Sequence, residues 1–258
     1  MTALLTGFAP TPSRNAGTRT RPVLLACSHG TSSSAGQLAV AGLVLAVAAR
    51  RPDLDVRSSF VDVQEPDVPS TLASIGSRAV NVVPLLLSAG YHVHVDLAEA
   101  AADAHDAAVR PALGPDLRLA GQLVRRLDEA GVQPSDAVVL AAAGSSDRRA
   151  VEHCEAMGRM LAELLGRDVT VGYISAVEPA LGDAVETARR TAPGRRVAVA
   201  TYLLAPGYFA DLAAASGADV VSAPLLLAGE PAPRAGRAGA GPLRGLRQSE
   251  RPSHHAGQ

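Results

Sequence analysis

Apolar residues along this chain recur in short runs, which alternate with amphipathic stretches and are separated by turn residues. Three runs have the length and β-branched content of buried strands: 23–27, 56–61 and 79–87. Three stretches have a helical period: 37–49, 68–75 and 97–108. Pro84 inside the third apolar run predicts an irregular or edge position, because proline cannot donate to a sheet ladder. The alternation of strand and helix predicts a parallel sheet that helices cover on both faces.

The pattern then starts again, which indicates a duplicated α/β unit. Apolar run 137–142 repeats 23–27, and a Gly/Ser loop follows each run. Two further blocks match in the same order: 173–179 with 60–66, and 202–208 with 85–91. The offset between matched positions stays between 113 and 117 residues, as in Phe60 to Tyr173 and Leu85 to Tyr202. Matched blocks in the same order at a near-constant offset predict two tandem halves of the same fold.

The two ends of the chain differ from the part between them. Residues 1–21 and 229–258 are rich in Gly, Pro, Ala, Thr and Arg, and they lack a hydrophobic period. Such segments cannot bury enough apolar surface to offset their ordering entropy, so we predict disordered tails. Between them we expect a first half (22–113), a linker with one amphipathic helix (114–136) and a second half (137–228).

Composition excludes several function classes. The 24 basic residues nearly balance the 25 acidic ones, so no nucleic-acid partner and no membrane surface is expected. All basic residues are Arg, which excludes a Schiff-base lysine and a P-loop lysine. The two cysteines form no CxxC pair and suit a reducing compartment, so we expect a cytoplasmic protein. No apolar run approaches membrane-spanning length.

Two imidazoles follow the ends of predicted strands in the first half only. His29 comes directly after the first strand, and the matching residue of the second half is Ala143. His92 follows the run that ends at 87, and its match is Phe209. Ligands of open α/β sheets lie at the carboxyl ends of the strands. A lone loop histidine is more often a hydrogen-bonded cap, but two that the duplicate lacks favour a functional site.

A carboxylate accompanies these imidazoles. Glu65 lies just beyond the second predicted strand, and the second half retains it as Glu178. Two imidazoles and a carboxylate at one rim suit a borderline divalent cation such as Fe²⁺, Co²⁺ or Zn²⁺. A neutral imidazole also accepts protons near pH 7.

Residues 29–36 allow a second interpretation, an anion-binding loop before a helix. The loop lacks the Walker lysine and the GxGxxG spacing, so support for a nucleotide is weak. A phosphate- or nucleotide-binding protein stays open as an alternative, as does a non-catalytic carrier of metal or tetrapyrrole.

Three blocks together resemble the sirohydrochlorin chelatases, class II chelatases related to ferrochelatase. The blocks are residues 24–32 with His29, residues 60–69 with Glu65 and Pro66, and residues 84–96 with His92. The resemblance covers about residues 22–228 and neither tail.

The resemblance implies two flavodoxin-like halves around a cleft, and insertion of Fe²⁺ or Co²⁺ into a sirohydrochlorin-type tetrapyrrole. It gives His29 the role of metal-binding proton acceptor and His92 that of second metal ligand. It implies substrate contacts at Glu65 and along one run: Leu87, Ser88, Ala89, Gly90, Tyr91 and His92. The metal is then a substrate, and we expect no permanently bound cofactor. With one active half, we expect a monomer with pseudo-twofold halves.

Overall fold

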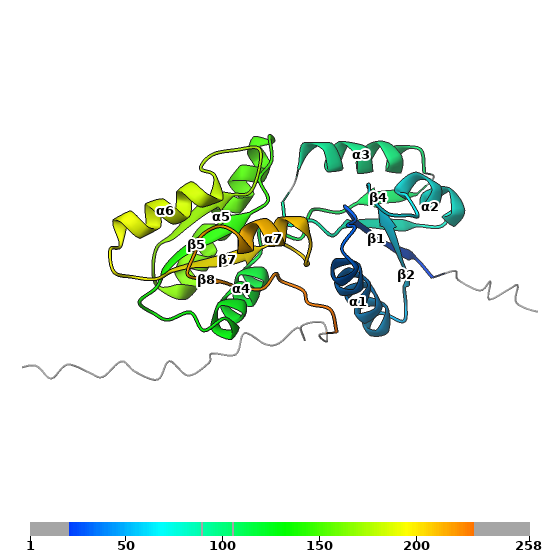
Figure 1. The fold of residues 1–258 in the computed structure, drawn as a ribbon. Coiled ribbons are helices and arrows are strands. Elements are labelled where there is room, and N and C mark those ends of the chain that lie inside the picture. Colours follow the sequence, from blue (N-terminus) through cyan, green and yellow to red (C-terminus); the bar gives the residue numbers. More distant parts are fainter. Residues whose placement is uncertain (1–20, 89, 105, 230–258) are drawn as a thin grey trace, which may run out of the picture.

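The computed structural model describes residues 21–88, 90–104 and 106–229, without the side chains of residues 91–94. Within these residues the chain forms two α/β halves that lie side by side (Figure 1). Each half holds a four-stranded parallel sheet, with strand order β2-β1-β3-β4 in the first and β6-β5-β7-β8 in the second. The predicted duplication of a parallel-sheet unit is confirmed.

The first half has these elements in chain order: β1 Val23–Ser28, α1 Ser34–Arg50, β2 Asp55–Phe60, α2 Val68–Ile75, β3 Val80–Pro84, α3 Tyr91–Ala102 and β4 Ala107–Val109. Helix α4 Leu117–Glu129 follows. The second half repeats the order: β5 Ala137–Ala142, α5 Arg148–Leu165, β6 Val169–Tyr173, α6 Leu181–Thr191, β7 Val197–Tyr202, α7 Tyr208–Ala214 and β8 Val220–Val221.

The second half buries both faces of its sheet under helices. Residues of α4 and α5 share one core cluster with the face of β5 that carries Leu140, and α6 and α7 share another with the face that carries Val139. Alternate residues of a strand point to opposite faces, so the central strands β5 and β7 contribute to both clusters. Helix α4, which follows the first half in the chain, therefore packs on the core of the second half.

Helix α1 of the first half is the counterpart of α5, but it is covered differently. It is apolar around its whole circumference, yet Leu38 and Leu45 are 64% and 69% exposed. Among the described residues, no second helix packs on α1 in the way that α4 packs on α5. The main core cluster of the first half lies on the other face of its sheet, under α2 and α3.

Two local predictions were wrong in part. The predicted helix 97–108 is α3 over Tyr91–Ala102, and β4 follows it at Ala107–Val109. Alanine-rich residues that favour a helix form this strand because it pairs with β3. Strand β3 is not at an edge either, since it lies between β1 and β4. Pro84 is tolerated because it is the last residue of β3, and the pairing with β4 ends two residues earlier, at Val82.

The halves contact each other around a pseudo-twofold axis. A Cβ added at Gly207 would lie 3.2 Å from Thr31 Oγ1, and one added at Gly90 would lie 4.0 Å from Ser145 Oγ. Gly90 matches Gly207 and Thr31 matches Ser145, so the two contacts are equivalent. Reciprocal contacts of this kind are the signature of an isologous interface, here within one chain.

Candidate active site

The loop after β1 holds His29 through its backbone and leaves the imidazole exposed. The His29 carbonyl accepts a hydrogen bond from Asp62 N at 3.0 Å, and the Ser28 carbonyl accepts one from Val61 N at 2.9 Å. The chain then turns at Gly30, where φ is +94° and a Cβ would collide with the Asp62 carbonyl oxygen. Only glycine fits this turn. His29 thus stands on a braced backbone at the carboxyl end of β1.

The second half builds the same loop without an imidazole. The Ala143 carbonyl accepts from Ser175 N at 3.0 Å, the Ala142 carbonyl accepts from Ile174 N at 2.9 Å, and Gly144 has φ +89°. The turn beyond each strand also matches, because Val63 and Ala176 both have positive φ. The two loops therefore differ in their side chains and share their backbone.

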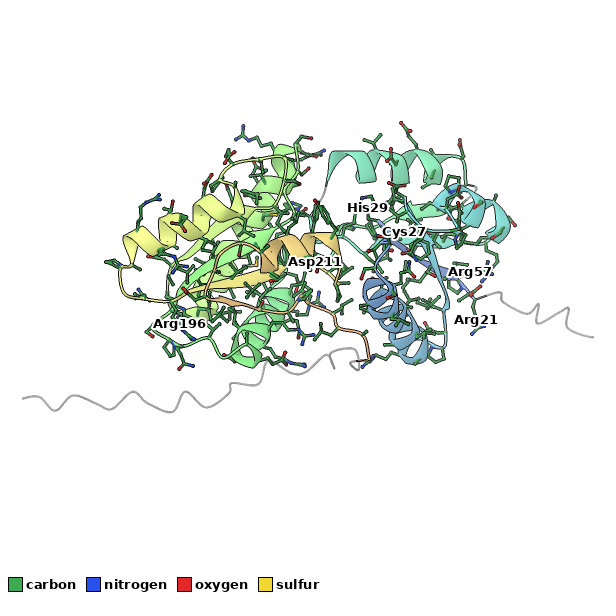
Figure 2. All side chains as sticks on the ribbon, viewed as in Figure 1. Arg21, Cys27, His29, Arg57, Arg196 and Asp211 are labelled. Carbon is green, nitrogen blue, oxygen red and sulfur yellow. The ribbon has the colours of Figure 1, made fainter. Side chains whose placement is uncertain are left out.

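A cavity of about 550 Å³ lies between the halves, and His29 lines it. Its walls come from both sheets: the first half contributes 28–32, 63–64 and 85–88, and the second half contributes 142–145 and 202–210. Figure 2 shows His29 on the side of the first half that faces the second. Neither half alone encloses this space.

The run predicted to contact substrate borders the cavity where the structure describes it. Leu87, Ser88 and Gly90 line the cavity. The Leu87 carbonyl accepts a hydrogen bond from the Tyr202 hydroxyl of the second half at 2.8 Å. Ala89 and the side chains of Tyr91 and His92 lie outside the described residues. The backbone of His92 is in the first turn of α3, two residues after Gly90, and its imidazole's position relative to His29 stays a prediction.

Glu65 lies apart from the described cavity lining. Its carboxylate accepts a hydrogen bond from Asp67 N at 2.9 Å, and that of Glu178 accepts from Ala180 N at 2.8 Å. The same carboxylate–amide hydrogen bond in the two loops explains why both halves carry this glutamate. Its predicted contact with substrate stays a prediction.

The residue next to Glu65 connects the second loop to the His29 loop. Gln64 lines the cavity, and its Oε1 accepts a hydrogen bond from Thr31 N at 3.0 Å. The matching residue of the second half is Val177. Comparing the sequences of the two halves could have identified Gln64, because the second half has an apolar residue at the matching position.

Three backbone amides of the loop before α1, those of Thr31, Ser33 and Gly36, have partners within the protein. Besides Thr31 N, Ser33 N donates to Thr31 Oγ1 at 3.1 Å, and Gly36 N donates to Ser33 Oγ at 3.3 Å. An anion-binding loop needs free amides that point at the ligand. These side-chain caps argue against a phosphate site at residues 29–36.

A buried thiol also lines the cavity. The thiol belongs to Cys154 of α5, and burial raises its pKa to about 11. The thiolate, not the thiol, binds metals. Cys154 is therefore protonated near neutral pH and shapes the cavity wall. Among the described residues, no three His, Cys, Asp or Glu side chains gather into a metal cluster. His29 is the imidazole in the described lining of the cavity.

A family model described as CbiX matches residues 23–130 and 137–228. Solved structures resemble the chain over both halves. "SirB from Bacillus subtilis with Fe3+" has 21% identity and a TM-score of 0.66, covering 80% of this chain and 89% of that one. The sirohydrochlorin chelatase SirB of Bacillus subtilis subspecies spizizenii, in complex with cobalt, has 17% identity and a TM-score of 0.60, covering 80% and 88%.

A third structure has a similar extent. CbiX, described as the terminal enzyme for biosynthesis of siroheme in denitrifying bacteria, has 22% identity and a TM-score of 0.56, covering 80% of this chain and 92% of that one. No curated protein matches the sequence. At these identities the solved structures establish the shared fold.

Proposed function

The chain belongs to the CbiX family, and from this premise we propose that it inserts Fe²⁺ or Co²⁺ into a sirohydrochlorin-type tetrapyrrole. One observation carries the proposal: an exposed imidazole, His29, lines the cavity between two halves of equal fold, and the duplicate has Ala143 in its place. The cavity is formed by residues of both halves, and the difference between the copies supports the first half as the catalytic side.

Metal insertion exchanges two pyrrole protons for one divalent cation. The ring therefore gains four metal–nitrogen bonds and releases two protons, and a base must accept them. A neutral imidazole both coordinates a borderline divalent cation and accepts a proton near pH 7. We assign both jobs to His29, with His92 as a second metal ligand and with Glu65 and residues 87–92 as substrate contacts.

The metal is a substrate in this scheme, and the protein needs no resident cofactor. A site of few imidazoles holds a metal loosely enough to release it, whereas several thiolates would retain it. The protonated Cys154 thiol is consistent with that requirement. Iron and cobalt both accept nitrogen and oxygen ligands, so the proposal includes both metals.

Two further observations bear on where we place the reaction. No helix in the described part of the chain is long and apolar enough to cross a membrane. Cys27 and Cys154 are both buried and unpaired. Reduced thiols suit the cytoplasm, where we place the reaction. We further propose a monomer, because the two halves of one chain already form the cavity.

The test is an anaerobic absorbance assay with purified full-length chain, metal-free sirohydrochlorin and Co²⁺ or Fe²⁺. We expect metallation faster than the spontaneous reaction at the same concentrations. Tetrapyrrole or metal binding without acceleration would show a carrier instead. Binding of neither, with nucleotide binding in a parallel titration, would overturn the proposal and restore the anion-loop alternative.

A further inference from the structure

Two aromatic residues at the start of α7 are unusually exposed for their size. Tyr208 is 71% exposed and Phe209 is 38% exposed. Their ring centroids are 6.0 Å apart with an interplanar angle of 36°. Both residues line the cavity between the halves. Large apolar rings that border a cavity and keep much of their surface accessible indicate a contact for a ligand.

The fold brings this pair close to the His29 loop. Gly207 precedes α7, and a Cβ added there would lie 3.2 Å from Thr31 Oγ1, two residues beyond His29. In Figure 1, α7 lies on the side of the second half that faces the first. Tyr208 and Phe209 thus stand across the cavity from the proposed proton acceptor.

The rest of the described lining carries little charge. Among the described residues that line the cavity there is no Asp, Glu or Arg, and the chain has no Lys. Apolar side chains make up much of the wall, including Leu85, Leu86, Leu203 and Leu204. A tetrapyrrole with many carboxylates would therefore find no described ion-pair partner inside. Burying an unpaired carboxylate is costly, whereas burying a flat conjugated face against apolar walls is favourable.

We propose that Tyr208 and Phe209 hold the tetrapyrrole by its flat face, with its carboxylates directed out of the cavity into solvent. This inference rests on the proposed function and names the part of the second half that recognises the substrate. Aromatic side chains contact flat conjugated faces through offset or edge-to-face packing, and Tyr208 and Phe209 are neighbouring rings in the cavity lining. The second half then supplies an aromatic surface where the first half carries Tyr91 and His92.

The first test measures binding of metal-free sirohydrochlorin to the full chain by absorbance titration. We expect Tyr208→Ala and Phe209→Ala each to raise Kd by about threefold to tenfold, the range for one aromatic contact. Tyr208→Phe keeps the ring and should bind within about twofold of wild type. Leu212→Ala is the matched control, because Leu212 is on the same helix, is 37% exposed and lies apart from the described lining. Melting temperatures of all variants exclude general unfolding.

Steady-state kinetics of metallation separate an effect on tetrapyrrole binding from an effect on the metal-insertion step. We expect the two alanine variants to raise the KM for the tetrapyrrole and to keep turnover at saturation near the wild-type value, because His29 is intact. A second measurement varies salt from about 0.05 to 0.5 M, which screens charge pairs. We expect the wild-type Kd to change little, since apolar contact dominates.

The outcomes distinguish this inference from the proposed function. If wild type metallates the ring but both alanine variants bind like wild type, or salt weakens binding steeply, the face-contact model is overturned and the function stands. If wild type neither binds nor metallates the tetrapyrrole, the proposed function fails and this inference fails with it. If Leu212→Ala raised the Kd for sirohydrochlorin as much as Tyr208→Ala does, the assignment of Tyr208 and Phe209 as face contacts would also be overturned.

Discussion

The two halves share a loop backbone and differ in the side chain that the loop presents. After β1 the loop carries His29, and after β5 the same hydrogen bonds and the same positive-φ glycine carry Ala143. Both copies therefore have the same supporting loop backbone. One copy lost an imidazole or the other gained one. The backbone geometry at the strand end is therefore common to both halves, and a single side chain decides whether an imidazole stands there.

The halves also differ in how they are covered. Arg148–Leu165 (α5) has α4 packed against it, whereas α1 leaves Leu38 and Leu45 exposed. The second half also contacts the first through Tyr202, whose hydroxyl donates a hydrogen bond to the Leu87 carbonyl oxygen. The segment after β3, which lines the cavity, therefore has a hydrogen-bond partner in the second half. Four sets of variants test these differences between the halves.

The largest effect is expected from His29→Ala. It removes the proposed proton acceptor and a metal ligand together, so the rate of metal insertion should fall about 100-fold or more. Anaerobic absorbance kinetics at saturating metal and tetrapyrrole measure it. The exposed side chain makes little structural contribution, so the melting temperature should stay close to wild type.

His153→Ala is the control for His29, because it deletes an imidazole of α5 outside the described cavity lining. It should keep turnover within about threefold of wild type, far from the loss expected for a general base. Near-normal turnover in the His29 variant would leave the mechanism without its base. Adding Ala143→His to His29→Ala should not restore activity if the second half lacks the remaining ligands.

The next effect concerns the glycines that both loops need. Gly30→Ala and Gly144→Ala each force a Cβ into a backbone carbonyl at positive φ, so each should lower stability by roughly 2–4 kcal/mol. Urea unfolding measures the change. Gly42→Ala is the contrast: its site in α1 is open, and the helix should gain about 0.5–1 kcal/mol. A tolerated substitution at only one of the two loops would show that their backbones differ.

The two ion pairs should also differ in how their contribution to stability depends on pH. Hydrogen bonding to Arg196 holds the pKa of Asp136 below its ordinary value, and that side chain is 3% exposed. In the first half, Arg57 and Arg78 lower the pKa of Asp55, whose side chain is 25% exposed. The folded-state pKa is depressed, so the stabilisation is present above about pH 4 and is lost as the pH falls through the folded-state value.

Asp136→Asn should therefore cost about 1.5–3 kcal/mol at pH 7, the range for a hydrogen bond to a charged group. The difference from wild type should shrink in urea titrations as the pH falls below about 4. Asp55→Asn, the matched variant, should cost less because the Asp55 side chain is 25% exposed and that of Asp136 only 3%, so solvent screens the Asp55 ion pairs more strongly. An equal cost that does not change with pH would contradict the assigned ion pair.

The smallest effect is expected from Tyr202→Phe. It leaves the Leu87 carbonyl without its partner across the halves, at a cost of about 1 kcal/mol in stability. Because Leu87 lines the cavity, the KM for tetrapyrrole should rise more than turnover falls. The first half has Leu85 at the matching position, and Leu85→Ala should instead lose stability through its buried packing. An unchanged KM in Tyr202→Phe would separate this bond from substrate binding.

The sequence alone determined the duplicated parallel-sheet architecture and the asymmetry of His29 against Ala143. Local sequence patterns were enough to predict these features, because apolar strand runs, turn glycines and the offset between the copies can be read directly from the sequence. The remaining features depend on contacts between elements that are distant in the chain. Strand β4 forms from alanine-rich residues because β3 offers it a partner, and Pro84 is tolerated where the pairing with β4 stops. The carboxylate of Glu65 is engaged by its own loop, while Gln64 reaches the His29 loop. The contacts of Tyr202, Cys154 and Tyr208 depend on packing between residues distant in the chain, which no local pattern encodes.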